Sequence, residues 1–197
     1  MNGKAQRSPE LLDPDLTRRE IIVYSYYRDA ELRGSNLLYR LLRLISDGDA
    51  QINLTHHLAD ETRHAWLWTE RIQEIGGAPL PIDDGYQVRI GKRVGVPRDI
   101  IDLLALTVVV EQRSLRRYRQ HLRRSGVPAR TQEVLRAVTQ DEVWHVDWIR
   151  RKARELAARD GGPGRVDDAL RRYREVDRAV MAELAEVEEA LTGGPAS

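Results

Sequence analysis

Two five-residue stretches decide how this chain folds: DETRH at residues 60–64 and DEVWH at residues 141–145. Both follow the pattern D-E-x-x-H, although the 197-residue chain contains only five histidines, so two copies are not expected by chance. Residues three apart lie on one face of an α-helix, so the Glu and His of each copy can reach the same ion. Metals that favour imidazole and carboxylate ligands take about four to six donors. Neighbouring helices are therefore expected to supply further carboxylates.

Two glutamates on apolar stripes are the candidates for those carboxylates. Glu31 shares a stripe with Tyr24 and Tyr27, and Glu111 shares one with Leu104. A carboxylate that faces a protein core is costly unless a partner neutralises it. Glu111 follows Glu31 by 80 residues, and the second D-E-x-x-H follows the first by 81. Each half of the chain thus carries one Glu and then, about thirty residues later, one Glu-x-x-His.

Two kinds of partner can neutralise these four glutamates. Two divalent cations balance four carboxylates, and neutral imidazoles add no charge, so a metal-loaded site can lie in a core. The alternative is that buried arginines, such as Arg63 or Arg113, pair with the glutamates. The repeated spacing favours the metals.

Five amphipathic helices are predicted from apolar residues that recur at spacings of three and four. Residues 76–98 hold three prolines and five glycines, too many for a helix, so an irregular connection is expected there, with at most a short extended piece. Short links make antiparallel neighbours of the first two helices and of the next two, whereas the long link can cross the length of a bundle. The expected helices span residues 16–46, 52–75, 97–124, 129–158 and 165–191, after a disordered arm at residues 1–14.

Over residues 16–158 the pattern resembles the ferritin-like di-iron carboxylate superfamily. The resemblance implies an all-α fold, with a ferritin-like antiparallel four-helix bundle at residues 15–160 and a long crossover between its second and third helices. A C-terminal amphipathic helix at residues 165–192 would pack on the bundle or in a dimer seam. Two metal ions, as an Fe/Fe, Fe/Mn or Mn/Mn pair, would lie between the helices. The implied ligands are Glu31, Glu61, His64, Glu111, Glu142 and His145, of which Glu61 and Glu142 would bridge the ions.

The resemblance also implies residues that support these ligands. Asp60 and Asp141 match positions that accept a hydrogen bond from the histidine of the opposite motif, which fixes its tautomer. The alternative for both is an ordinary surface aspartate. Tyr27, one turn from Glu31, is either a redox-active neighbour of the metals or a core residue. His57, one turn from Glu61, is likewise either an outer base or a core residue.

Several departures narrow the expected function within the superfamily. The chain has no cysteine, so it has no fused rubredoxin centre and electrons would come from an external donor. Ser114 stands where many rubrerythrins place an additional glutamate, and the long last helix disfavours a storage cage. We therefore predict an oxidoreductase that activates O₂ or peroxide and acts on an unknown small-molecule substrate. The alternative is a ferroxidase or iron-binding protein whose substrate is Fe(II).

The composition of the chain indicates which binding partners and which cellular location to expect. The 32 basic and 31 acidic residues nearly balance, which disfavours nucleic acid as the main partner. No apolar run is long enough to span a membrane and the start lacks the apolar core of a signal peptide, so a cytoplasmic protein is expected. The arginine-rich run at residues 113–124 is either a solvated face or a site for an acidic partner. The last helix leaves a homodimer open.

Overall fold

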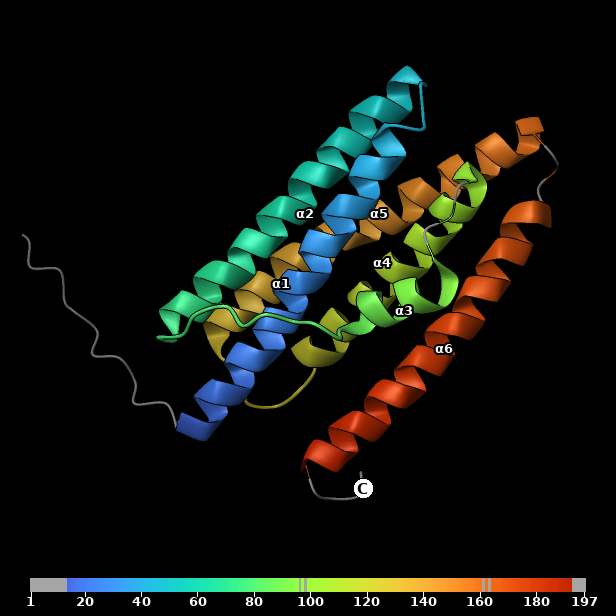
Figure 1. The fold of residues 1–197 in the computed structure, drawn as a ribbon. Coiled ribbons are helices and arrows are strands. Elements are labelled where there is room, and N and C mark those ends of the chain that lie inside the picture. The colour runs from blue at the N-terminus through green and yellow to red at the C-terminus, as the bar shows by residue number, and fades with distance from the viewer. Residues whose placement is uncertain (1–13, 96, 98, 161, 163, 193–197) are drawn as a thin grey trace, which may run out of the picture.

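The computed structural model describes residues 14–95, 97, 99–160, 162 and 164–192, and these form six α-helices and no strand. Helices α1 (Pro14–Leu42) and α2 (Gly48–Glu74) form one antiparallel hairpin. Helices α4 (Ile100–Leu122) and α5 (Ala129–Asp160) form the second hairpin, as Figure 1 shows. The all-helical prediction is therefore confirmed. The expected arm at residues 1–14 lies outside the described residues except for Pro14, which begins α1 because a proline suits the first turn of a helix.

Side-chain caps fix where helices α2 and α4 begin. The Asp47 carboxylate accepts a hydrogen bond from the Ala50 amide at 2.9 Å at the start of α2. The Asp99 carboxylate does the same for the Ile101 amide at 3.0 Å at the start of α4. Such caps satisfy amides that have no partner within the helix. At the other end of α2, Gly76 adopts φ 80°, which a residue with a side chain rarely does.

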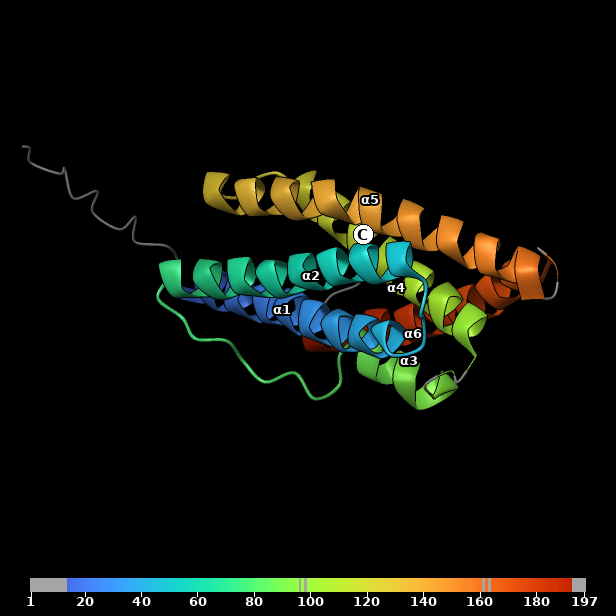
Figure 2. The same cartoon turned by 90° about the horizontal axis from the view of Figure 1, so that it is seen from above.

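The connection between the hairpins crosses the molecule along the outside of α1 (Figure 2). The Ser25 hydroxyl accepts a hydrogen bond from the Leu80 amide at 3.0 Å, and Gln87 donates to the Ala30 carbonyl at 3.0 Å. The chain thus returns to the end of the bundle at which α2 began, so α2 and α4 run in the same direction.

The expectation of no helix within residues 76–98 was wrong, because α3 (Tyr86–Val94) lies there. The prolines and most of the glycines fall on either side of it, and Gly91 is the one breaker inside the helix. Tyr86 and Ile90 are buried, so burial of one apolar face stabilises this short helix.

Two apolar clusters fill the bundle, one toward each end. The first includes Leu38, Leu54 and Leu104, and the second includes Tyr24, Trp68, Tyr118 and Leu135. On each helix of the two hairpins, the residues between these clusters carry the polar motifs. The candidate site therefore lies at mid-height, enclosed by apolar layers.

The last helix, α6 (Gly164–Thr192), runs antiparallel to α5 and packs against α4 and α3. Its buried residues include Val166, Tyr173 and Val180, as the predicted stripe requires. Within the chain, this helix thus packs on the bundle, and the dimer seam stays an expectation; the side chains of residues 186–192 lie outside the described part. Within the described residues, no helix is both long and apolar enough to cross a bilayer.

Candidate metal centre

Glutamates from all four bundle helices converge at mid-height of the bundle. Glu31 of α1, Glu61 of α2 and Glu111 of α4 are each 2% exposed, and Glu142 of α5 is fully buried. Burying even one ionised carboxylate without a partner is strongly unfavourable. Four carboxylates together in a core therefore require compensating positive charge or protons.

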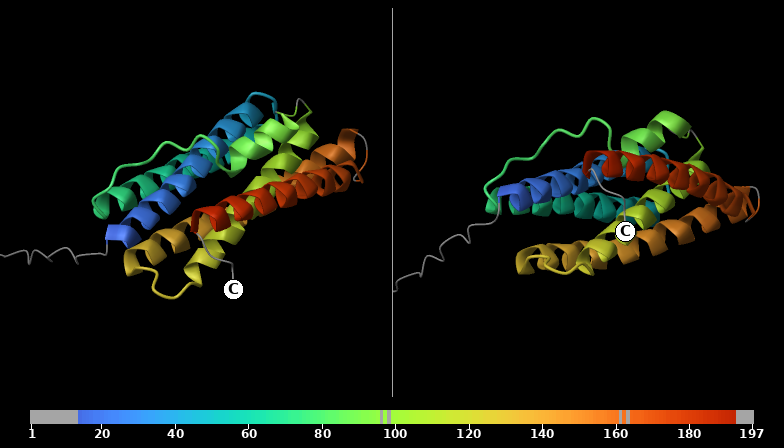
Figure 3. Two further views of the ribbon diagram at one scale, coloured as in Figure 1. Left: turned by 60° about the horizontal axis from the view of Figure 1, so that its bottom comes forward. Right: turned by 90° about the horizontal axis from the view of Figure 1, so that it is seen from below.

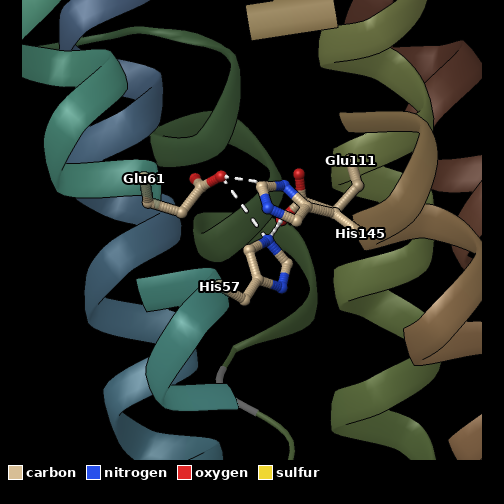
Figure 4. Close-up of side chains that lie close together, drawn as sticks. All are labelled: His57, Glu61, Glu111 and His145. Atoms are coloured by element: carbon tan, nitrogen blue, oxygen red, sulfur yellow. Dashed lines mark ion pairs between the residues drawn. The ribbon is translucent and has the colours of Figure 1, made fainter. Parts of the chain in front are cut away.

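The buried ligand atoms form two sets of four, and the atoms of each set lie within 4.8 Å of one another. Glu61 belongs to both sets. All six ligands expected from the sequence are brought together, and one additional histidine, His57, joins them. The first set is Glu31, Glu61, His64 and Glu142; the second, shown in Figure 4, is His57, Glu61, Glu111 and His145.

In the first set, three carboxylates surround one imidazole nitrogen. The His64 Nδ1 atom lies 3.5 Å from Glu31 Oε2, 3.6 Å from Glu142 Oε1 and 3.9 Å from Glu61 Oε1. These separations exceed normal hydrogen-bond lengths. Ligands that are each about 2.0–2.2 Å from a shared ion lie roughly 3–3.5 Å from one another, so the spacing fits an ion at the centre of the set.

The second set has two imidazoles. The His145 Nδ1 atom lies 3.5 Å from Glu61 Oε1, and the His57 Nε2 atom lies 3.5 Å from Glu61 Oε1 and 3.6 Å from Glu111 Oε1. The His57 and His145 rings stack with centroids 3.6 Å apart. Glu142 also reaches this side, 3.6 Å from His145 Nδ1. Glu61 and Glu142 therefore each approach both Nδ1 atoms, which is the arrangement expected of bridging carboxylates.

Many atoms of the cluster have no hydrogen-bond partner although they are buried. They include both nitrogens of His57, both oxygens of Glu142, and the Nδ1 atoms of His64 and His145. Buried polar groups without partners are rare in proteins, and each requires an explanation. Cations among these atoms would satisfy Nε2 of His57, the Glu142 oxygens and both Nδ1 atoms, so the residues fit a metal centre.

The alternative in which arginines neutralise the glutamates does not hold. Across the described part of the chain, no arginine or lysine forms an ion pair with any of the four glutamates. Arg113 instead pairs with Asp177 of α6, with Nη2 and Oδ2 2.5 Å apart. Arg63 pairs with Asp60 and Asp141 at 3.2 and 2.5 Å.

Those two aspartates make the hydrogen bonds that the family resemblance implies. Asp60 lies 3.2 Å from Nε2 of His145, and Asp141 lies 3.0 Å from Nε2 of His64, so each bond crosses between the hairpins. A neutral imidazole that donates its Nε2 proton keeps a lone pair on Nδ1, which here faces the carboxylates. Arg63 pairs with both aspartates from the solvent side and so links the two aspartate–histidine pairs.

The tyrosine that bonds to the cluster is Tyr118 of α4. Its hydroxyl donates to Glu31 Oε1. The predicted neighbour, Tyr27, is buried beside it with ring centroids 4.9 Å apart, but its hydroxyl pairs with Nδ1 of His121 at 3.1 Å. Tyr27 and Tyr118 both point to the helix interface, and helix packing, which sequence spacing alone does not fix, decides which hydroxyl reaches Glu31.

Two further features support the cluster from α1 and α2. His57 lies four residues before Glu61 and seven before His64, so helix periodicity places all three on one stripe. Gly34 lies against Glu61, because a Cβ atom at residue 34 would overlap Glu61 Oε2. The absence of a side chain at that position allows Glu61 to lie between the two donor sets.

Burial and the mutual repulsion of the glutamates shift the pKa values of the side chains in this cluster. Burial, and then repulsion from the other glutamates, raises the pKa of Glu61 and that of Glu111 well above the usual range. Burial also lowers the pKa of His57. For His64, burial lowers the pKa, but the hydrogen bond to Asp141 and the nearby carboxylates of Glu142 and Glu31 outweigh it and raise the pKa to about 11. The protein atoms thus favour protons where cations would otherwise lie.

Comparison of this chain with protein-family models, with curated proteins and with solved structures gives no match. The geometry of the buried cluster, and the sequence pattern that produces it, are therefore the observations on which a functional assignment rests.

Proposed function

We propose that this protein is a ferritin-like di-metal carboxylate oxidoreductase that binds two iron ions, or an iron–manganese or manganese pair, and activates O₂ or peroxide. The observation that carries the proposal is the pair of buried four-residue donor sets that share Glu61. The parallel course of α2 and α4, with a long connection between the hairpins, supports the ferritin-like assignment.

The donor types support iron or manganese. Imidazole and carboxylate together suit iron, and carboxylates suit manganese. Each ion would have four protein donors, which leaves positions for an exogenous ligand on a metal that takes up to six. A closed structural site would instead fill every position with protein atoms. The site is therefore suited to chemistry rather than to structural support alone.

The chain's own residues would prepare such a site. When bound, the metal pair would supply the redox equivalents that O₂ or peroxide activation requires. Asp60 and Asp141 fix the imidazole tautomers so that Nδ1 keeps its lone pair. Burial raises the pKa of Tyr118, so that its hydroxyl keeps its proton and donates to Glu31. The apolar layers above and below exclude bulk water from the centre.

Anaerobic metal titration tests the first part of the proposal. We expect two equivalents of Fe(II) to bind per chain, and Glu61→Gln to weaken both sites because Glu61 belongs to both. The matched control is Glu133→Gln on the exposed face of α5, which should leave both sites unchanged. Binding of fewer than two equivalents to the wild-type chain would contradict the di-metal assignment.

Exposure of the loaded protein to O₂ tests the second part. An oxidoreductase with an external electron donor should oxidise its iron and, when a chemical reductant is added, consume O₂ over many turnovers. Stoichiometric oxidation that releases or stores Fe(III), with Fe(II) as the consumed substrate, would instead favour the ferroxidase function. No oxidation of bound Fe(II) by either O₂ or peroxide would overturn the redox proposal.

A further inference from the structure

A surface groove, separate from the buried metal centre, lies on the outer face of α4. Helices α5 and α6 diverge from their shared turn, and α4 lies across the space between them, as Figure 3 shows. A groove of about 610 Å³ lies there, and four of its eight lining residues are arginines. Arg116, Arg119 and Arg123 come from α4, and Arg174 faces them from α6.

The arginines of α4 share one helix face. Their spacing of three and four residues places Arg116, Arg119 and Arg123 along a single stripe. Like charges at this spacing repel one another and destabilise a helix. The basic run at residues 113–124 is therefore not evenly distributed around α4, and part of it forms a concentrated positive surface.

The groove arginines differ from their neighbours in having no protein partner. Arg113 pairs with Asp177, and Arg117 lies over the Tyr27 ring at 5.4 Å. Among the described residues, none of the four groove arginines forms an ion pair or hydrogen bond with another side chain. No carboxylate lines the groove either. Four exposed arginines thus line one groove that has no carboxylate among its lining residues.

We propose that this groove binds a small polyanion that carries at least two phosphate groups. A guanidinium group is planar and can donate two parallel hydrogen bonds to phosphate oxygens, so four of them can hold two phosphates. Leu115 and Val146 add a small apolar surface beside the arginines. The proposal rests on this charge arrangement alone and is independent of the metal centre.

A small molecule fits the groove better than a nucleic acid does. No aromatic side chain lines the groove, whereas single-stranded nucleic acid sites stack bases on aromatic rings. The chain as a whole carries a formal charge of only +1, which is far from the broad positive surface of a polynucleotide binder. The groove volume of about 610 Å³ lies in the range of small-molecule sites.

Calorimetric titration of the full chain with inorganic pyrophosphate tests the proposal. We expect saturable binding of one pyrophosphate per chain that weakens as salt is raised. The Arg119→Gln/Arg174→Gln variant should bind at least about tenfold more weakly, because two charged hydrogen-bond donors are lost. Its thermal unfolding temperature should stay the same or rise, since like-charge repulsion is relieved, so loss of binding would not reflect misfolding.

The matched control is Arg19→Gln/Arg151→Gln, which removes an equal number of positive charges at exposed positions outside the groove. It should bind pyrophosphate as tightly as the wild-type chain, and it keeps any contribution from metal ions in the core unchanged. Equal weakening in both variants, or no saturable binding to the wild-type chain, would overturn the proposal. Citrate binding as tight as that of pyrophosphate would reassign the groove to carboxylates, and tighter binding of a single-stranded RNA would reassign it to nucleic acid.

Discussion

Asp60 and Asp141 hold the outer nitrogens of the two histidines whose inner nitrogens face the glutamates. Replacing either aspartate by alanine should lower metal affinity roughly 10–100-fold, because the imidazole loses its fixed tautomer and orientation. Competition titration with a chromogenic chelator measures this change. Asp147→Ala, on the exposed face of α5, is the control that should leave affinity unchanged. Unchanged affinity in both Asp60 and Asp141 variants would separate these aspartates from metal binding.

His57 offers a second test at the same scale. His57→Leu removes a donor from the second set only, so one of two bound Fe(II) ions should be lost or bound much more weakly while the first set keeps its four donors. Thr55→Leu is the control, since Thr55 is an exposed residue of the same helix. Loss of both ions in equal measure would show instead that the two sets act as one unit.

Sequence spacing predicts which buried Glu and His side chains converge better than it predicts their neighbours. Helix periodicity and the repeated motif predicted the six residues that converge, and the same periodicity also places His57 on their stripe. Spacing alone gives His57 only as an outer base or a core residue, because a lone histidine on an apolar face is usually a packing residue. The choice of Tyr118 over Tyr27 depends on how two helices cross, and one chain's spacing does not contain that information.

At the scale of the helix, Gly34 and Gly91 test what a missing side chain contributes. Gly91 of α3 has open space around its Cα, so Gly91→Ala should stabilise the protein by about 0.5–1 kcal/mol through helix propensity. Gly34→Ala would gain the same propensity, but its Cβ would displace the Glu61 carboxylate. We expect metal affinity to fall roughly tenfold or more in Gly34→Ala only. Thermal unfolding and metal titration of both variants measure the two effects, and equal affinities would remove the role given to Gly34.

The helices were predictable to different degrees for a physical reason. The four long bundle helices each bury a stripe over many turns, so their pattern stands out from the sequence. Helix α3 has only nine residues between breakers, and its stability comes from burial of Tyr86 and Ile90 against other elements. One such contact is the hydrogen bond from the Tyr86 hydroxyl to Asp177 of α6, at 2.7 Å, which no local pattern reveals.

At the scale of the whole molecule, metal binding should control stability. A ligand that binds only the folded state at a hundredfold excess over its Kd stabilises that state by about 2.7 kcal/mol, so two ions give twice that gain. For a chain of this length the loaded protein should melt roughly 10–20 °C above the metal-free protein. Differential scanning calorimetry before and after metal removal checks this. An unchanged melting temperature would mean that the ions contribute little to folding.

The metal-free protein should also become less stable as pH rises from about 7 to about 9. The folded-state pKa of His64 is about 11, above its ordinary value of 6.5, and burial raises the pKa of Glu61, Glu111 and Glu142. In this interval the folded state holds more protons than the unfolded state, so the free energy of unfolding decreases as pH increases.

Cations that replace those protons should remove most of this pH dependence. Calorimetry at several pH values, with and without metal, measures the difference. The Glu61→Gln/Glu142→Gln variant should show a flatter pH profile than the metal-free wild-type chain and should melt at a higher temperature. A lower melting temperature for that variant would indicate that the glutamates stabilise the metal-free fold through partners of their own.

Neither hairpin supplies a complete donor set by itself. The first set takes three residues from α1 and α2 and only Glu142 from the other hairpin, and the second set takes two residues from each. An ion bound in either set would therefore link the α1–α2 hairpin to the α4–α5 hairpin. If the chain were cut once in the long connection between α2 and α3, bound metal should hold the two fragments together more firmly than their shared apolar clusters do alone. The metal supply would then influence how long the two halves stay associated.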